Sequence, residues 1–537
     1  MATDSVLPLP LGEDRVEGGR SRAALLLLIS VTLSACTVGP DYKQPSVWSP
    51  TSWFANRKPP TPTLASLPVA EPVDPEWWAI LNDPTLTALM RRVAESNLDV
   101  RAATFRLAEA RAQRGVTGAQ QYPSANANAS YTRELISRKG VLGAIGGAST
   151  GAGTSSQTGS NGLGGTMGAP PTSSGGGGGL PPFDLFQSGF DAAWELDLWG
   201  RVRRAVESAD AQIDASTEAR RQILVASLAE LARDYVQLRG TQESLRITRA
   251  NLASSQESAN LSNERFRGGL ATDLDVANAL AQVESTAATI PQLEQQQDQA
   301  INAISLLLGA PPGALSMELL PPQPVPPVPP RVPVGIPSDL VHRRPDIRQA
   351  EAQLHAATAD IGQAQAEYYP KITLSGSFAL QATQLKDAFS LASRTYGLGP
   401  SITIPIFDGA RIARTVELRK AQQQEAAINF QKTVLSAFHD VDNAIIAFRA
   451  EQQRRDRLQA QVTLARRALG LAQQRFRQGV SDFLEVLTAQ RTALQAEQQL
   501  AESTTTVSTN LVALYKALGG GWEPTSASPG PLGRWPG

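Results

Sequence analysis

Cys36 is the residue whose position in the sequence points most clearly to a specific chemistry, the attachment of a lipid. Cys36 is the only cysteine of the 537 residues and directly follows Leu33-Ser34-Ala35. Small residues before a lone cysteine suit the signal peptidase of lipoproteins, because a narrow pocket accepts them and the thiol is lipidated before cleavage. The apolar run at residues 23–31 is too short to span a bilayer and is typical of a signal peptide. We therefore predict a lipid anchor on Cys36 and removal of residues 1–35.

The residue after this cysteine indicates where the protein is exported. Thr37 stands there instead of an aspartate, which favours the outer membrane of a Gram-negative cell. Outer-membrane lipid would then be a partner of the mature chain. The alternative for this segment is a buried cysteine behind a hydrophobic patch.

The other residues that could act in catalysis or bind a metal have no partners at the spacing of a known motif. The three histidines are widely separated, and one cysteine can form neither an intrachain disulfide nor a cysteine-based zinc site. We find no nucleophile–base pair and no phosphate loop in the sequence. The formal net charge is −1, which argues against nucleic acid as the main partner, because a phosphate-binding surface needs a large basic excess. The sequence therefore predicts no enzyme, no cofactor and no metal.

The chain contains an internal sequence repeat, and the helices and strands of this repeat position the candidate site residues. Arg265-Phe266-Arg267-Gly268-Gly269-Leu270 recurs as Arg475-Phe476-Arg477-Gln478-Gly479-Val480, an offset of 210 residues. Tyr122-Pro123 recurs as Tyr369-Pro370, an offset of 247 residues. The offset is larger before residue 124 than after residue 264, because a Gly/Ser/Thr-rich tract is inserted in the first half. We predict that this tract forms an external loop at residues 140–187.

These matches divide the chain into segments. We predict a lipid-anchored extended segment (36–85), a first repeat (86–309), a Pro-rich equatorial belt (310–338), a second repeat (339–519) and a flexible C-terminal tail (520–537).

Long helices are expected in both repeats, at residues 201–308 and 411–518. Residues 201–290 and 411–521 contain no proline and are rich in good helix formers. A helix of about 65 residues is about 100 Å long and is unstable alone in water. These helices must therefore pack laterally, as in a coiled coil.

Four short segments alternate between apolar and polar residues and predict strands. They are residues 124–132, 190–198, 371–380 and 396–406. Their length suits a tilted crossing of a bilayer, with one face toward lipid and one toward water. A soluble, half-buried sheet is the alternative.

Four strands cannot close a barrel, and an open sheet edge is not tolerated in lipid. Several copies must therefore share one barrel, and three copies would give twelve strands around a water-filled lumen. That three copies take part is inferred only from the requirement that the barrel must close.

Several motifs together carry a family resemblance. They are Cys36-Thr37-Val38-Gly39-Pro40-Asp41-Tyr42, Trp77-Trp78, Asp83-Pro84-Thr85-Leu86, Ser338-Asp339-Leu340, Arg343-Arg344-Pro345-Asp346-Ile347 and the two glycine turns. With them the chain resembles the outer-membrane factor lipoproteins of tripartite efflux systems, the NodT-type branch of the TolC-like family.

This resemblance implies a fold and a set of partners. The fold is an α+β membrane protein with internal duplication, in which a trimeric outer-membrane β-barrel with four strands per chain continues into a long periplasmic α-helical barrel. The resemblance also implies a passive exit duct for small molecules, served by a periplasmic adaptor (a membrane fusion protein) and an inner-membrane pump, often of the resistance–nodulation–division class. Two alternatives are the outer-membrane component of a type I protein secretion system and a lipid-tethered periplasmic coiled-coil scaffold.

The glycine turns and the residues beyond the second turn are the candidate sites. The resemblance implies that the glycine turns are exposed tips that dock on the adaptor. The alternative is that they only connect the helices of a hairpin. The tip residues are Gly268, Gly269, Leu270, Gly479 and Val480. Leu484, Thr488 and Arg491 share one helix face, where the family has a constricting leucine ring and an aspartate ring. Thr488 replaces that aspartate, and interhelical packing is the alternative role of Leu484.

Two acids at the end of the second predicted strand are the remaining candidates. Glu195 and Asp197 would line the lumen and give the exit a negative field. Solvation at the strand-to-helix junction is the alternative.

Overall fold

A computed structural model describes residues 37–54, 65–135 and 182–523. Cys36, the predicted signal peptide, most of the Gly-rich tract and residues 524–537 of the predicted tail lie outside the described residues. The described residues divide into two compact units, one of residues 37–41, 113–135, 182–209 and 358–421 and one of the other described residues.

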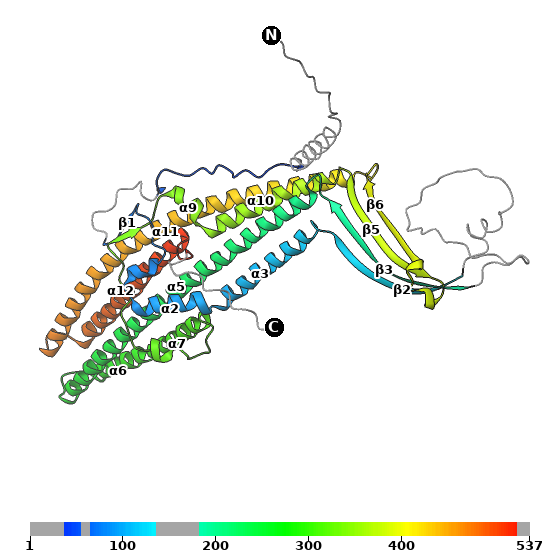
Figure 1. The fold of residues 1–537 in the computed structure, drawn as a ribbon. Coiled ribbons are helices and arrows are strands. Elements are labelled where there is room, and N and C mark those ends of the chain that lie inside the picture. The colour runs from blue at the N-terminus through cyan, green and yellow to red at the C-terminus, as the bar shows by residue number, and fades with distance from the viewer. Residues whose placement is uncertain (1–36, 55–64, 136–181, 524–537) are drawn as a thin grey trace, which may run out of the picture. The chain divides into compact units, whose positions relative to one another are not determined.

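Helices make up most of the described chain (Figure 1). They are α2 (Pro84–Ser96), α3 (Leu98–Ala119), α5 (Arg201–Arg267), α6 (Asp273–Ala287), α7 (Thr289–Leu307), α8 (Ser316–Leu319), α9 (Pro337–Arg343), α10 (Pro345–Ala366), α11 (Arg411–Arg477) and α12 (Phe483–Leu518). Short 3₁₀ turns occur at η2 (Trp77–Leu81), η3 (Leu385–Asp387) and η4 (Leu391–Ser393). None of the described helices has the length and apolar content needed to cross a membrane.

The bounds of the helices follow the duplication. α5 and α11 are both 67 residues long and start 210 residues apart, and α6 and α12 start with the same offset. α3 and α10 are both 22 residues long and start 247 residues apart. The first return helix is broken at Ala288, where α6 ends and α7 begins, because Pro291 has no amide hydrogen for the carbonyl of Ala287.

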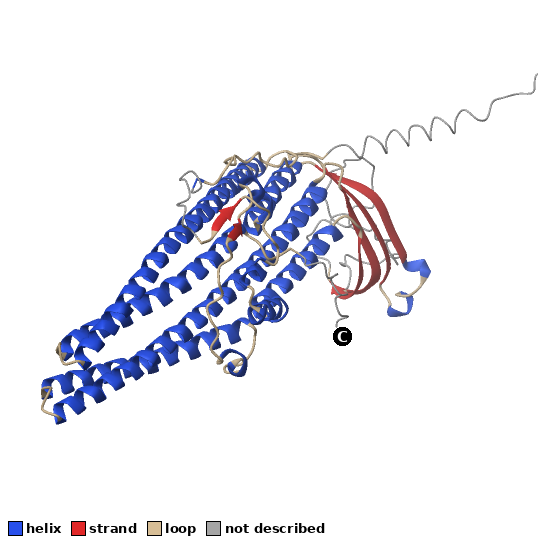
Figure 2. Cartoon of the chain, turned by 90° about the vertical axis from the view of Figure 1, so that its left-hand side faces the viewer, coloured by secondary structure: helices blue, strands red, loops and turns tan. Residues whose placement is uncertain are grey.

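Four strands form one antiparallel sheet in the first unit, drawn in red in Figure 2. They are β2 (Ser124–Glu134), β3 (Phe183–Leu196), β5 (Lys371–Ala382) and β6 (Arg394–Thr403), in the order β2-β3-β5-β6. The pairing of β3 with β5 therefore joins the two repeats. Among the described strands, β2 and β6 each have a neighbour on one side only.

The register of this sheet separates apolar from polar side chains. Phe190, Phe378 and Tyr396 are paired across three strands and share one face. Asn126 and Asp191 are paired on the opposite face, where Asn126 donates a hydrogen bond to Asp191. The three aromatic rings are exposed, so one face of the sheet is apolar and is not covered by other residues that the structure describes.

Two of the predicted strands, β3 and β6, have other ends in the structure. β3 begins at Phe183 instead of residue 190, so residues 183–187 belong to the sheet and not to the predicted external loop. β3 also ends at Leu196, because the carboxylate of Asp197 accepts a hydrogen bond from the backbone of α5. β6 ends at Thr403 instead of residue 406, because Pro405 cannot donate to a sheet ladder.

The core of the second unit lies among helices and the two short strands β1 (Leu67–Val69) and β4 (Arg331–Pro333), which pair in parallel. Trp77 stacks on Tyr515 with ring centroids 5.2 Å apart. The predicted extended segment and the Pro-rich belt thus each contribute a strand and buried side chains to this core.

Candidate functional site

The first glycine turn joins α5 to α6 and is called here the first tip (residues 265–275). Gly269 has φ +72°, a left-handed conformation that suits glycine at a helix end. The amide of Leu270 donates to the carbonyl of Arg265 at 2.8 Å, which closes the end of α5. Thr272 then caps α6 and forms a reciprocal capping box with Asp275.

The second glycine turn joins α11 to α12 and is called here the second tip (residues 475–485). Gly479 has φ +76°, and the amide of Val480 donates to the carbonyl of Arg475 at 3.0 Å. Asp482 caps α12 by accepting from the amide of Glu485. The two tips therefore have the same backbone design, and Leu270 and Val480 are exposed at corresponding positions.

The two tips contact each other through an arginine and an aromatic ring. The guanidinium of Arg265 lies 4.5 Å from the ring centroid of Phe476 and also donates to the Phe476 carbonyl. Phe476 meets Phe483 edge to face, with centroids 5.6 Å apart. Both rings are buried in a small apolar cluster with Val486.

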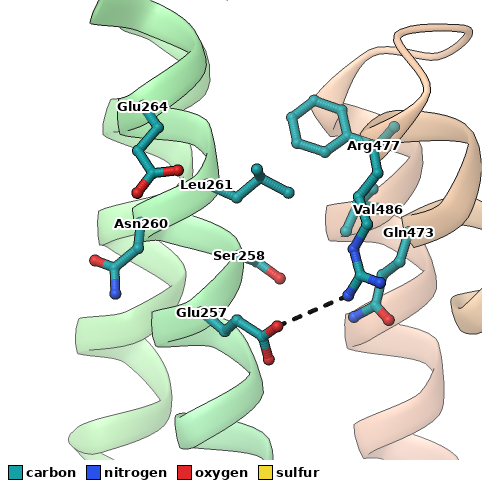
Figure 3. A pocket seen from close by; sticks show the side chains of 9 residues that line it. Glu257, Ser258, Asn260, Leu261, Glu264, Gln473, Arg477 and Val486 are labelled. Atoms are coloured by element: carbon teal, nitrogen blue, oxygen red, sulfur yellow. Dashed lines mark ion pairs between the residues drawn. The ribbon is translucent and has the colours of Figure 1, made fainter.

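A pocket of about 270 Å³ lies beside this contact, between α5 and the pair α11–α12 (Figure 3). Glu257 and Ser258 line it from α5, and Arg477 and Val486 line it from the other side. Arg477 forms an ion pair with Glu257 at 3.7 Å across the pocket. The pocket is therefore part of the contact between the two hairpins, and its lining holds no grouping of residues typical of catalysis.

The predicted aperture residues lie on α12, directly after the second tip. The Leu484 side chain is 61% exposed, so it is not packed within the single chain. The hydroxyl of Thr488 donates to the Leu484 carbonyl, and Arg491 donates to the Gln282 side chain of α6 at 2.7 Å. Arg491 thus holds α12 to α6, a contact that the sequence pattern did not reveal.

The two predicted lumen acids lie at the junction of β3 and α5. Arg201 donates two hydrogen bonds to the Glu195 carboxylate, both at 2.8 Å. Asp197 follows the strand and accepts from the backbone amide of Arg203 at 2.8 Å. A lumen role for these acids stays a prediction, and their ion pairs with Arg201 and Arg203 balance part of any negative field.

A buried arginine that sequence reasoning missed holds the segment after Cys36. Arg204 donates to the carbonyls of Val38 and Gly39 and forms an ion pair with Asp41 at 2.6 Å. A β-carbon on Gly39 would lie 2.3 Å from the α-carbon of Gly362. The Val38-Gly39 motif is thus explained by close backbone packing.

Tyr42, which follows Asp41 in the sequence, packs within the second unit. Tyr42 stacks on His355 with ring centroids 4.3 Å apart and donates to the Glu351 carboxylate at 3.2 Å. Burial, together with the charge of Glu351, raises the pKa of the Tyr42 phenol, so it remains a neutral donor.

The class of protein follows from these features. A sheet whose apolar face is exposed and whose outer strands, β2 and β6, have one described neighbour each is typical of a protein that associates with a membrane or with further chains. The described residues include no group of three or more metal-ligating side chains that could hold an ion.

The comparison with known families gives the particular class. Residues 89–310 and 336–520 match the outer membrane efflux protein family, and the chain belongs to it. Two curated relatives extend over most of the chain. Outer membrane protein OprJ of Pseudomonas aeruginosa is 32% identical, covering 93% of this chain and 95% of that protein. A probable outer membrane lipoprotein, SilC of Salmonella typhimurium, is 29% identical, covering 93% and 99% respectively.

A solved structure agrees with these relatives. The outer-membrane channel OprN has a TM-score of 0.77 and 33% identity, covering 91% of this chain and 100% of that chain. The protein is therefore an exit duct of an efflux system in the outer membrane of a Gram-negative cell. The predicted family, function and location are confirmed.

Proposed function

We propose that three copies of the chain form this duct, as a twelve-stranded β-barrel that continues into a helical barrel across the periplasm. The observation that carries the proposal is the sheet, which has an exposed apolar face and strand neighbours on only one side of β2 and β6. Backbone groups at such edges need partners in lipid, where no water can satisfy them. β6 of one copy would pair with β2 of the next, and repetition would close the barrel.

The same arrangement accounts for conduction without catalysis. The polar face of the sheet, with Asn126, Asp191 and Ser377, would surround a water-filled lumen. The apolar face, with Phe190 and Tyr396, would meet lipid. Small molecules would then pass through passively, and energy would come from an inner-membrane pump, of the resistance–nodulation–division class by the family resemblance.

The two tips are proposed to dock on the periplasmic adaptor. Leu270 and Val480 are exposed apolar side chains next to glycines with fixed turns. Exposed apolar side chains on rigid turns are suited to burial by a partner. The proposed docking residues are Gly268, Gly269, Leu270, Gly479 and Val480.

An aperture near the tips is proposed on α12. Exposed Leu484 would meet its counterparts from the other copies and narrow the lumen, with Thr488 and Arg491 on the same helix face. The contact of Arg491 with Gln282 would hold α12 in the narrow arrangement.

A lipid on Cys36 is proposed to fix the mature chain to the membrane. The lone cysteine after Leu33-Ser34-Ala35 supports it. One relative, SilC, is named as a probable lipoprotein.

Charge substitutions on the two faces of the sheet test the proposed barrel. Leu398→Arg places a charge on the apolar face, and Ser401→Arg places the same charge on the polar face of the same strand. An arginine facing lipid costs about 2–4 kcal/mol at mid-membrane depth. We expect Leu398→Arg to reduce the protein recovered from outer-membrane fractions, and Ser401→Arg to leave it near the wild-type amount. Equal recovery of both variants would contradict the proposed orientation of the sheet.

A further inference from the structure

The polar face of the sheet carries one carboxylate that is held between two amides. Asp191 of β3 accepts a hydrogen bond from the side chain of Asn126 at 3.1 Å and a second one from the side chain of Asn128. Both asparagines lie on β2, Asn126 directly opposite Asp191 and Asn128 two residues further along. Hydrogen bonds to a charged oxygen are about twice as strong as those between neutral groups, so the two amides fix the carboxylate on this face.

The side chains around Asp191 on the same face are short. Asp191 is paired with Ser377 of β5, and Ser377 is paired with Gly397 of β6. Along β3, Gly189 and Ala193 lie two residues on either side of Asp191 and share its face, because the side chains of a strand alternate. These neighbours cannot reach over the carboxylate, so it stays accessible to a solute that passes along the polar face.

The charge of Asp191 differs from the charges of the two acids that the sequence places in the lumen. Glu195 forms an ion pair with Arg201 at 2.8 Å, and Asp197 lies 3.5 Å from Arg203. Asp191 has neutral hydrogen-bond partners instead, and it forms no ion pair with a residue that the structure describes. Its negative charge is therefore not balanced nearby, whereas arginines balance much of the charge of the other two acids.

We propose that Asp191 makes the duct selective for cations and favours exported solutes that carry a positive charge. The inference rests on the proposed duct, in which the polar face of the sheet surrounds the lumen and three copies place three Asp191 carboxylates at one level. Acidic side chains around a pore attract cations and repel anions. At about 6 Å in water, one carboxylate changes the local concentration of a monovalent ion about threefold.

The ion selectivity of the purified full-length protein in a planar bilayer tests this proposal. The reversal potential in a KCl gradient gives the ratio of K⁺ permeability to Cl⁻ permeability. The test variant is Asp191→Asn, which removes the charge and keeps a side chain of similar size. We expect the ratio to favour K⁺ in the wild type and to fall about threefold in the variant. This difference should shrink at high salt, because salt screens the carboxylates.

Asp184→Asn is the matched control, because it removes the same charge from the opposite face of the same strand. Asp184 is paired with Arg133, and the alternation along β3 places it on the face of Phe186 and Phe190. This variant should keep the permeability ratio of the wild type.

Ser377→Lys tests the same charge without removing either hydrogen bond of Asp191. Ser377 is directly opposite Asp191 on β5, so the new ammonium group can balance the carboxylate. We expect this variant to lose selectivity for K⁺ as Asp191→Asn does.

The outcomes separate this inference from the duct itself. A wild-type protein that conducts no ions would overturn the duct and, with it, the role of Asp191. A conducting protein with the same permeability ratio in wild type, Asp191→Asn and Ser377→Lys would overturn the role of Asp191 and leave the duct intact. An equal fall in Asp191→Asn and Asp184→Asn would also overturn it. A fall in Asp191→Asn and Ser377→Lys alone would support it.

Discussion

The two tips share one backbone design and differ in what covers their side chains. At the second tip, Phe476 is buried beneath Arg265 and packs on Phe483. At the first tip, the equivalent Phe266 is exposed. The difference arises because the contact between the tips covers Phe476 of the second tip and leaves Phe266 of the first tip uncovered by the described residues. An internal duplication thus shows, in one chain, both a filled contact and the surface of an unfilled one.

The sheet presents a related contrast. β3 and β5 have strands on both sides, whereas β2 and β6 each have one neighbour among the described strands. The sheet and the tips therefore both leave surfaces that the proposed assembly would complete. The following substitutions break or sharpen this comparison.

The largest effect is expected from removing the buried ring. Phe476→Ala should destabilise the second tip by about 3–5 kcal/mol, because a buried aromatic side chain is lost and a cavity remains. Hydrogen exchange of amides at the ends of α11 and α12 would measure this loss. Phe266→Ala is the matched variant, and it should destabilise the assembled protein and have little effect on the isolated chain. An unchanged assembly would show that no neighbour covers Phe266.

A substitution at a glycine turn should have the next largest effect. Gly479→Val forces a β-branched residue into a left-handed conformation, at a cost of about 1–2 kcal/mol. We expect reduced export in cells and an intact oligomer, because the change is confined to the proposed docking tip. Gly470→Val is the control, since Gly470 lies within α11, outside the proposed docking residues, and a β-carbon there meets no described neighbour within 4 Å. Normal export by the Gly479→Val variant would argue against docking at the second tip.

The proposed aperture predicts an effect on conductance. Leu484→Ser should increase the single-channel current in a planar bilayer, because a smaller polar side chain widens and wets the narrowest level. Leu274→Ser, at the equivalent position of the first tip and also exposed, should leave the current unchanged. Equal currents from wild type and Leu484→Ser would remove Leu484 from the aperture.

The smallest effect is expected from a charge reversal at the contact between the tips. Glu257→Arg replaces the intrachain ion pair with Arg477 by two like charges, and an exposed ion pair is worth about 0.2–1 kcal/mol. Hydrogen exchange of amides around Glu257 and Arg477 should become slightly faster at low salt, and this difference from wild type should vanish at high salt. A difference that persists at high salt would contradict the electrostatic explanation.

Much of the fold was predictable because local chemistry determines it. Gly269 and Gly479 end helices in a conformation that few other residues adopt, so their spacing revealed the duplication. Period-two alternation identified the four strands and their apolar faces, since side chains of a strand point to opposite sides in turn.

The element ends and the site contacts were less predictable because they depend on distant residues. Asp197 continues the alternation of β3, but its carboxylate caps α5 instead. Arg204 carries no motif signal, although it holds the segment of Val38 and Gly39. The contact of Arg491 with Gln282 joins two helices and could not be read from one helix face.

The native mass of the purified, full-length protein in detergent tests most directly that the chain is one part of a shared duct. Native mass spectrometry should give the mass of three chains, because three copies with four strands each would close the proposed twelve-stranded barrel. A single chain as the only stable species, under conditions that preserve its helices and strands, would contradict this account.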